Sequence, residues 1–564
     1  MTRLVNDPST FATDALAGFA DSQGDRVLPV GSGVVRAHRA PTGQVAIVMG
    51  GGSGHFPAFA GWVGKGFGHG AVCGGVFASP SDSQIVAVAR EADSAGGVLF
   101  TPINYAGDML HFTAAAERLR ADGVDVRMVV ITDDIASGSV LAPSDRRGIA
   151  GSFVVIKMAG AAAERGDSLA EVERIARAAN DATRTFGVAF SGCTLPGGSA
   201  PLFTVPPGRM AVGLGIHGEP GISEQELGTA ADVADVLVDG LFAERPPQSG
   251  RGVAVLVNGL GATKYDELFL VLGRVKSRLG AEGMHAVAPV AGEQVTSLDM
   301  AGVSVSFAYL DDELEELWLA AADTPSFSRG GVPTTAPPRR SLHTAAVGDE
   351  VIAEGSTASR AVGPFLASAF EAVQRLLEDQ ESRLGAVDAV AGDGDHGAGM
   401  MRGSRAAALS ARESVGQGAG LGTILGRAGR AWSDAGGGAS GAFWGAGLAA
   451  AGVVVGDQLT PGPVVVAAAA EAFSEAVRAR GGAQPGDKTM VDAIVPFVEE
   501  LHRGIDDGVS LERAWRAAAD VALLAAEETA QITSRLGRSR LHGERSIGSP
   551  DAGALSFALV VGAV

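Results

Sequence analysis

The chain changes its hydrophobic pattern once, near residue 330, and this change constrains its fold more than any other feature. Before it, short β-rich runs alternate with stretches of helical periodicity, which predicts α/β sheets. Expected strands are 44–49, 97–101, 126–132, 187–191, 210–216, 252–258 and 303–309. Expected helices include 264–280 and 168–186, which begins with the capping-box spacing of Ser168 and Glu171. About 330 residues exceed one ordinary domain, so we expect two α/β subdomains split near residue 190.

A proline-rich segment separates this region from a helical one. Residues 324–348 contain several prolines and no acidic residue, a composition typical of a semi-extended connector. The later segments have helical spacing and little strand character. Expected helices are 358–383, 398–412, 441–455, 462–479, 489–505 and 509–529. We therefore assign 1–330 to an α/β domain, 331–348 to the linker and 349–564 to an all-α domain.

Composition excludes several classes of protein. The 44 basic and 64 acidic residues give a net charge of −20, which repels a phosphate backbone and argues against general nucleic-acid binding. Cys73 and Cys193 are too few for a disulfide framework, so we expect buried, inert thiols in a reducing cytoplasm. The N-terminus lacks the apolar run of a signal peptide. Residues 435–456 are uncharged and long enough to span a membrane, but mostly Gly and Ala, which favours a soluble helix.

Glycine accounts for 81 of the 564 residues, about twice the usual share. The first expected strand, 44–49, runs into Gly50-Gly51-Gly52-Ser53-Gly54-His55, and Pro57 is expected to begin a helix. Such a loop either binds oxygen-rich ligands through its N–H groups or is a tight structural turn. Polar clusters at 104–108 and 216–221 also follow expected strands. Because ligands bind at the carboxyl ends of strands, His55, Asp108 and His217 together favour a site, although each alone could be structural.

The helical region holds a cluster of acids and a second glycine loop. Asp388, Asp393 and Asp395 are separated by glycines just before an expected helix, and carboxylates so spaced can converge on hard cations. The EF-hand pattern is not met, so Mg²⁺ shared with phosphates and simple helix capping remain the two interpretations. The run 436–441 opens another expected helix and offers a phosphate-binding loop.

These motifs together resemble the dihydroxyacetone kinase family. The resemblance rests on GGGSGH at 50–55, the SP pair at 79–80, NYxGD at 104–108 and GIHGEPG at 215–221, and on four segments of the helical region (384–400, 436–441, 481–490 and 537–554). It implies that the first domain binds a small ketose, which His217 holds as a covalent hemiaminal. His55 and Asp108 would handle the proton of the hydroxyl that is phosphorylated. The implied substrate-binding residues are Gly52, Ser53, Gly54, Ser79 and Asn104.

The same resemblance implies that the helical domain is a barrel that binds ATP. Asp388, Asp393 and Asp395 would hold two Mg²⁺ ions that bridge the phosphates. The implied nucleotide-binding residues are His396, Gly397, Ala398, Gly399, Ala439, Ser440, Gly481, Thr489, Met490, Arg538, Asp551, Ala552 and Gly553. Because both domains share one chain, the family pattern implies ATP as the phosphate donor. It also implies a cytoplasmic homodimer in which the active site is shared between subunits.

Three positions depart from the usual family motifs. Phe56 replaces an acid, Ile103 replaces a lysine beside the ketose, and Ala552 replaces a proline. The first two changes make the ketose pocket more apolar. Relatives with an aromatic residue at the position of Phe56 resemble erythrulose kinases, so we predict a kinase of erythrulose or dihydroxyacetone, with erythrulose favoured. The alternatives are a triose kinase with an FAD-cyclising side activity and a ketose-sensing regulatory protein.

Overall fold

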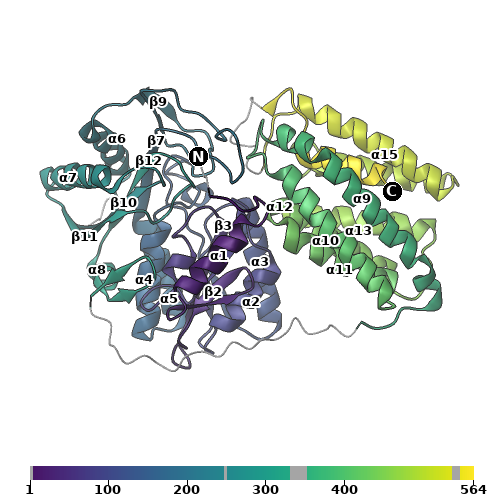
Figure 1. The fold of residues 1–564 in the computed structure, drawn as a ribbon, viewed down its shortest axis with the longest axis horizontal. Coiled ribbons are helices and arrows are strands. Elements are labelled where there is room, and N and C mark those ends of the chain that lie inside the picture. The colour runs from purple at the N-terminus through teal and green to yellow at the C-terminus, as the bar shows by residue number, and fades with distance from the viewer. Residues whose placement is uncertain (1–3, 247–249, 331–351, 537–545) are drawn as a thin grey trace. The chain divides into compact units, whose positions relative to one another are not determined.

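The computed structural model describes residues 4–246, 250–330, 352–536 and 546–564 (Figure 1). The chain divides into two compact units, Met1–His343 and Thr344–Val564. The linker predicted at 331–348 lies outside the described residues. The first residues of the expected connector instead belong to the first unit, where β13 (Ala322–Asp323) and β14 (Ser328–Arg329) pair in an antiparallel hairpin.

The first unit contains a six-stranded sheet in the order β1-β2-β4-β3-β5-β6. Its strands are β1 (Val27–Val30), β2 (Gly33–Arg36), β3 (Ala46–Ser53), β4 (Gly70–Val76), β5 (Val98–Phe100) and β6 (Val126–Met128). The helix α1 (Phe11–Ser22) precedes them. One face of the sheet packs against α2 (Asp82–Ala92) and α3 (Ala106–Ala121), and the other against α4 (Ser152–Arg165) and α5 (Leu169–Ala182). Strands β4, β3, β5 and β6 are parallel, so the loops that follow them meet at one edge.

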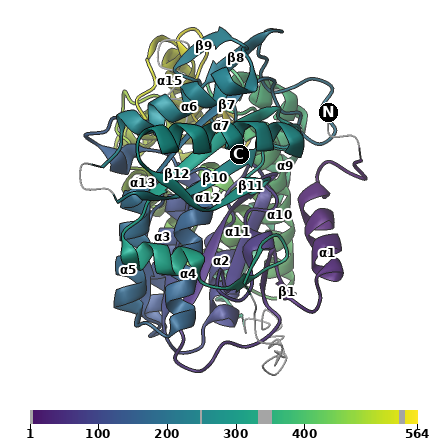
Figure 2. The same ribbon diagram turned by 90° about the vertical axis from the view of Figure 1, so that its left-hand side faces the viewer.

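A second six-stranded sheet of the same unit has the order β11-β10-β12-β7-β8-β9. Its strands are β7 (Thr183–Ala189), β8 (Arg209–Val212), β9 (Ser223–Glu226), β10 (Gly252–Gly259), β11 (His285–Gly292) and β12 (Gly302–Tyr309). Helices α6 (Ala230–Ala243) and α7 (Tyr265–Ala281) cover one face (Figure 2), and α8 (Asp312–Leu319) follows the last strand. The other face contributes to the same apolar cluster as the first sheet, so the two sheets share one core.

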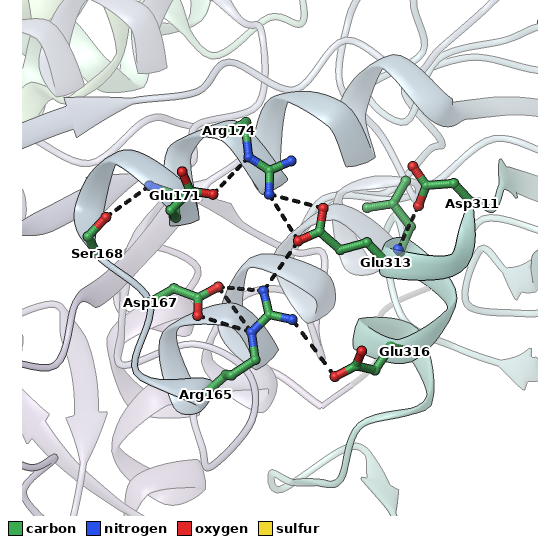
Figure 3. Close-up of polar contacts among 9 residues, drawn as sticks. Arg165, Asp167, Ser168, Glu171, Arg174, Asp311, Glu313 and Glu316 are labelled. Carbon is green, nitrogen blue, oxygen red and sulfur yellow. Dashed lines mark hydrogen bonds and ion pairs between the residues drawn. The ribbon is translucent and has the colours of Figure 1, made fainter.

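The helix predicted at 168–186 is too long. The structure ends α5 at Ala182, and the β-branched residues that follow belong to β7. The capping box is only half formed: Ser168 Oγ accepts from the N–H of Glu171 at 3.3 Å, but the Glu171 carboxylate accepts from Arg174 (Figure 3). The Glu171 side chain is thus paired with Arg174 of the same helix, and Arg174 also donates to Glu313 of α8.

The prediction of a glycine loop and a helix from Pro57 is also wrong. Residues 50–53 are the end of strand β3, and the next helical turn is the 3₁₀ segment Ala60–Trp62. Glycine is needed here for close packing of backbones. A Cβ built on Gly50 would lie 2.5 Å from the Val72 carbonyl of β4, and one on Gly52 would lie 2.7 Å from the N atom of Ala78.

The second unit is all helical, as predicted. Its helices are α9 (Thr357–Asp388), α10 (His396–Gly416), α11 (Leu421–Gly436), α12 (Gly438–Val455), α13 (Pro463–Gly481), α14 (Val491–Asp506), α15 (Leu511–Glu528) and α16 (Ala552–Gly562). Each helix packs against the next, and α16 packs against α9, which closes the ring implied by the family resemblance. Trp432 and Trp444 stack at 4.7 Å between centroids in its core. Helices α11 and α16 were not among those predicted.

The uncharged segment noted in the sequence forms helix α12. By length and composition it is the one described helix that could cross a membrane, and 44% of its apolar window is buried inside the protein. Trp444 of α12 packs on Phe473 of α13 and Phe557 of α16 in the core of the helical unit. This packing is that of a core helix.

Candidate active site

Two histidines from separate parts of the first unit meet at the ends of their strands. His55 follows β3, and His217 lies in the loop between β8 and β9. Their Nε2 atoms are 2.9 Å apart, while Nδ1 of His55 lies 2.7 Å from the carbonyl oxygen of Thr296. Burial and the neighbouring His217 lower the pKa of His55 to about 3, against the opposing effects of Thr296 and Glu219. His55 is therefore neutral at pH 7, with its proton on Nδ1.

Glu219 and two aromatic rings fix the orientation of the His217 imidazole. Glu219 Oε1 lies 3.2 Å from Nδ1 of His217. The rings of Phe77 and Tyr105 stand edge-on to His217 at 5.0 and 4.8 Å, and Phe77 also stacks on His55 at 4.9 Å. These contacts leave the edge of His217 that carries Nε2 directed at Nε2 of His55.

Asp108 lies in the first turn of α3 and is 3% exposed. A Cβ built on Gly51 would be 3.7 Å from its Oδ2, so the carboxylate lies beside the end of β3, a few residues before His55. Tyr105, at the start of the same helix, contacts His217. Elements that follow β3, β5 and β8 thus come together, which matches the convergence expected from the sequence.

The remaining predicted ketose residues have mainly structural contacts. Ser53 Oγ donates to the Gly74 carbonyl at 2.6 Å, and Ser79 is buried beyond the end of β4. Gly54 has a φ of 98°, and a Cβ there would lie 2.8 Å from the Phe77 ring, so glycine permits both the turn and the stacking on His55. The Asn104 amide donates to the carbonyls of Ser144 and Arg146 at 2.9 and 2.7 Å.

In the helical unit, Asp388, Asp393 and Asp395 form an acid cluster. Each offers an oxygen, and these three atoms all lie within 4.8 Å of one another. Burial and then Asp388 raise the pKa of Asp395 to about 7, with Arg402 opposing. A bound divalent cation would remove the electrostatic repulsion between these carboxylates. The three oxygen donors therefore fit a hard ion such as Mg²⁺.

His396 connects three helices next to the acid cluster. It begins α10, its Nε2 lies 2.8 Å from Ser556 Oγ of α16, and its Nδ1 lies 3.2 Å from Ser440 Oγ of α12. The N-termini of α10 and α12 therefore lie close to the acids, where N–H groups can meet phosphate oxygens. A Cβ on Gly397 would lie 2.0 Å from the Glu381 carbonyl, so glycine is required for α10 to approach α9.

The predicted nucleotide residues near α16 also come together. Asp551 caps the helix by accepting from the N–H of Ala554 at 2.7 Å, and burial followed by Asp388 and Asp492 raises its pKa to about 7. A Cβ on Gly553 would lie 3.5 Å from that of Met490. Ala552 begins α16, and Thr489 comes directly before Met490. The first turn of α10 contains Ala398 and Gly399, the first turn of α12 contains Ala439, and Gly481 ends α13. Arg538 lies outside the described residues.

Comparison with known proteins identifies the family. Residues 17–326 match the Dak1 domain, and residues 390–564 match the DAK2 domain. The chain belongs to the dihydroxyacetone kinase family. It is 52% identical over 569 residues to an L-erythrulose 1-kinase of Mycolicibacterium smegmatis, covering 100% of this chain and 99% of the relative. It is 50% identical over 563 residues to a D-erythrulose kinase of the same organism, covering 99% and 97%.

A solved structure extends the similarity to the fold of the whole chain. The dihydroxyacetone kinase of C. freundii in complex with AMP-PNP and Mg²⁺ is 31% identical, with a TM-score of 0.53, and the match covers 100% of this chain and 99% of that one. The predicted family, the α/β and all-α fold classes and the ATP-dependent ketose kinase class are confirmed by these comparisons.

Several residues of the site were not predicted from the sequence. Glu219 stands in the GIHGEPG motif but had no assigned role, and Thr296 gave no signal. Arg147 and Asp134 belong to the doublets RR and DD, which are conspicuous but do not reveal their partners. Cys193 is buried as predicted, whereas Cys73 is partly exposed. Burial raises the pKa of Cys73 to about 12 and that of Cys193 to about 11, so both thiols stay protonated at pH 7.

Proposed function

We propose that this kinase phosphorylates a terminal hydroxyl of erythrulose while His217 holds the ketose as a hemiaminal. The observation that carries the proposal is the buried pair of imidazoles, with Nε2 of His217 2.9 Å from Nε2 of neutral His55 and Nδ1 against Glu219. The identity of the substrate is supported by whole-chain similarity to two erythrulose kinases. Phe56, which is 55% exposed and packs edge-on against Phe19, supplies an apolar surface beside the site.

Covalent attachment explains how such a site selects its substrate. An imidazole nitrogen adds to a carbonyl carbon but has no such reaction with glycerol or other polyols. The ketose hydroxyls are then held in place, and phosphoryl transfer gains most of its rate from this orientation. Asp108 and His55 would receive the proton of the hydroxyl that attacks the phosphate. Gly52, Ser53, Gly54, Ser79 and Asn104 would form the walls of the pocket.

The helical unit would supply the phosphate donor. Asp388, Asp393 and Asp395 would hold Mg²⁺, as two ions, against ATP, and the metal would neutralise the charge of the phosphates. N–H groups at the starts of α10 and α12 would bind phosphate oxygens. Met490 and the start of α16 would contact the nucleoside. The ketose-binding domain would then comprise 1–330, with subdomains split near 190, followed by the linker 331–348 and the ATP-binding domain 349–564.

The setting of this reaction is also proposed. A cytoplasmic homodimer, with the helical domain of one subunit serving the ketose site of the other, fits the fusion of both domains in one chain, and sedimentation of the native protein tests the dimer. An FAD-cyclising side activity and a purely regulatory role are not favoured, because the two relatives named above are erythrulose kinases and match this chain over nearly its whole length.

The mass of the intact native protein with a trapped ketose tests the function directly. We expect an added mass equal to that of erythrulose, which disappears in His217→Ala. Steady-state assays with both erythrulose enantiomers and dihydroxyacetone then rank the substrates. A kcat/KM for dihydroxyacetone about tenfold above both erythruloses, a difference of about 1.4 kcal/mol in transition-state binding, would contradict the erythrulose preference.

A further inference from the structure

Glu219 contacts His217 with both of its carboxylate oxygens. Oε1 lies 3.2 Å from Nδ1, and Oε2 accepts a hydrogen bond of 3.0 Å from the backbone N–H of His217. Burial raises the pKa of Glu219, but the charges of Arg147 and His217 outweigh it and hold that pKa well below its ordinary value. Glu219 is therefore an ionised carboxylate fixed against one edge of the imidazole.

Arg147 joins this carboxylate to a second buried acid, Asp134. Its Nε and Nη2 donate to Asp134 Oδ2 at 3.0 and 2.8 Å, and its Nη1 lies 3.6 Å from Glu219 Oε2. A Cβ on Gly215 would lie 2.5 Å from Nη1 and 2.1 Å from Oε2, so glycine is what makes room for this arrangement. A chain of buried contacts thus runs from Asp134 through Arg147 and Glu219 to His217.

The hydrogen bonds of the two imidazoles fix where their protons are. His55 uses its Nδ1–H toward the Thr296 carbonyl, so its Nε2 is an acceptor. Nε2 of His217, 2.9 Å away, must then be the donor. Nδ1 of His217 faces an ionised carboxylate and also carries a proton. Both ring nitrogens of His217 are protonated in this arrangement, and Glu219 carries the counter-charge.

We propose that Arg147, anchored by Asp134, is a positioning residue that keeps Glu219 ionised against His217 and thereby stabilises the cationic imidazole to which the ketose becomes attached. The inference rests on the proposed covalent function and names the residues that sustain it. Arg147 and Asp134 act only through Glu219, and neither needs to touch the ketose.

The addition step balances around this charge. The proton on Nε2 of His217 passes to Nε2 of His55, and the freed electron pair forms the bond from His217 to the carbonyl carbon. The π pair of the C=O bond moves to the ketose oxygen, which takes the proton from His55. The His217 ring is an imidazolium before the step and an N-substituted imidazolium after it, so Glu219 balances one positive charge on this ring at both ends of the step.

The double variant Asp134→Asn/Arg147→Gln tests the proposal. It removes the guanidinium without leaving Asp134 as a buried, unpaired charge, and the Asn oxygen can still accept from the N–H of Ala136, now bonded at 3.0 Å. Intact mass at subsaturating ketose measures the fraction of full-length protein that carries erythrulose or dihydroxyacetone. We expect the equilibrium constant for adduct formation in the double variant to be at least about tenfold lower than in the wild type. The KM for the ketose should rise while the KM for ATP stays the same.

A spectroscopic signature separates positioning from general destabilisation. In full-length protein labelled with ¹⁵N-histidine, the NMR signals of His217 are assigned as those that disappear in His217→Ala. In the wild type at pH 7, these signals should show two protonated ring nitrogens. They should show a neutral ring in the double variant. Arg36→Gln is the matched control, because Arg36 is as buried as Arg147, at 7% exposure each, and pairs with Glu164 away from the histidines. It should keep the wild-type signals and adduct.

The possible outcomes lead to different conclusions. No ketose adduct in the wild type would overturn the covalent function itself. A wild-type adduct that persists unchanged in the double variant, or an unchanged ¹⁵N signature, would overturn only the role of Arg147. If the double variant fails to fold, Arg147→Lys keeps the positive charge but gives up the two-sided contact. It should retain more adduct than Glu219→Gln, and equal loss in both would also overturn the role of Arg147.

Discussion

Replacing Asp395 by Asn should stabilise the metal-free helical unit. The pKa of Asp395 rises from 3.8 to about 7, through burial and then Asp388. Each pKa unit corresponds to about 1.4 kcal/mol, so a shift of about three units makes ionised Asp395 cost up to about 4 kcal/mol. Because the side chain keeps partial contact with water, this figure is an upper limit. The cost is absent below about pH 4, where the acid is protonated in both states, and is complete above about pH 7.

Amide hydrogen exchange of helix α10 measures this effect within the helical unit alone. In EDTA at pH 8, exchange in Asp395→Asn should be slower than in the wild type, by up to about a thousandfold for 4 kcal/mol. At pH 5 the difference should shrink to about 1–2 kcal/mol, because the wild-type acid is then mostly protonated in the folded state. Added Mg²⁺ should slow exchange in the wild type and leave the variant unchanged.

The outcome that refutes this reasoning is specific. If Asp395→Asn exchanges at the wild-type rate at pH 8 without metal, the acids are not under electrostatic strain and the argument for a cation site loses its physical basis. If Mg²⁺ protects the variant as strongly as the wild type, the ion binds elsewhere. Arg405→Gln, a surface change in the same helix, controls for loss of a neighbouring charge, since the Arg405 side chain is 69% exposed.

Two further substitutions separate the ketose site from the nucleotide site. Gly215→Ala places a Cβ 2.1 Å from Glu219 Oε2. It should lower the amount of ketose adduct at least about tenfold and leave the affinity for the nucleotide unchanged. A wild-type amount of adduct, measured by intact mass, would show that the position of the Glu219 carboxylate does not matter for ketose binding. Lys488→Met removes the buried ammonium that donates to the carbonyls of Ile532, Ser546 and Ser549. It should raise the KM for ATP about tenfold or more and leave the ketose adduct unchanged. An unchanged KM for ATP would contradict a role for the Lys488 hydrogen bonds in positioning the residues before Asp551.

The sequence predicted those strands whose residues are β-branched and continuous, such as β10 and β12. It did not predict β4, whose glycines and cysteine give no strand signal. Gly70 lies against α2, where a Cβ would be 2.8 Å from a methyl group of Val88, so glycine permits the close packing of this strand against the helix. Helix α11 was missed for a related reason: its glycines weaken helix propensity, but a Cβ on Gly429 would be 2.9 Å from the carbonyl oxygen of Gly445 of α12. In both cases tertiary packing outweighs local preference.

The site shows the same division between local and distant signals. His55, Asp108 and His217 each stand in a short motif at the end of an expected strand, so their convergence followed from topology. Of the residues that set their protons, only Glu219 stands in one of these motifs. Thr296 contacts His55, and Arg147 contacts Glu219, from loops far away in the sequence. Only folding reveals which acid an arginine meets. A sequence therefore indicates which groups react more readily than which groups control their charge.

The two sites balance their charges in different ways. In the ketose site the buried charges alternate from Asp134 through Arg147 and Glu219 to His217, so the protein neutralises them with its own side chains. In the helical unit three acids lie within 4.8 Å of one another, and Asp395 has a raised pKa. The charges of the first arrangement balance without a ligand, whereas a bound cation would balance those of the second. This difference fits the proposed ligands: a ketose is small and uncharged, so the proposed covalent bond would replace the ionic contacts that a nucleotide would obtain through its metal.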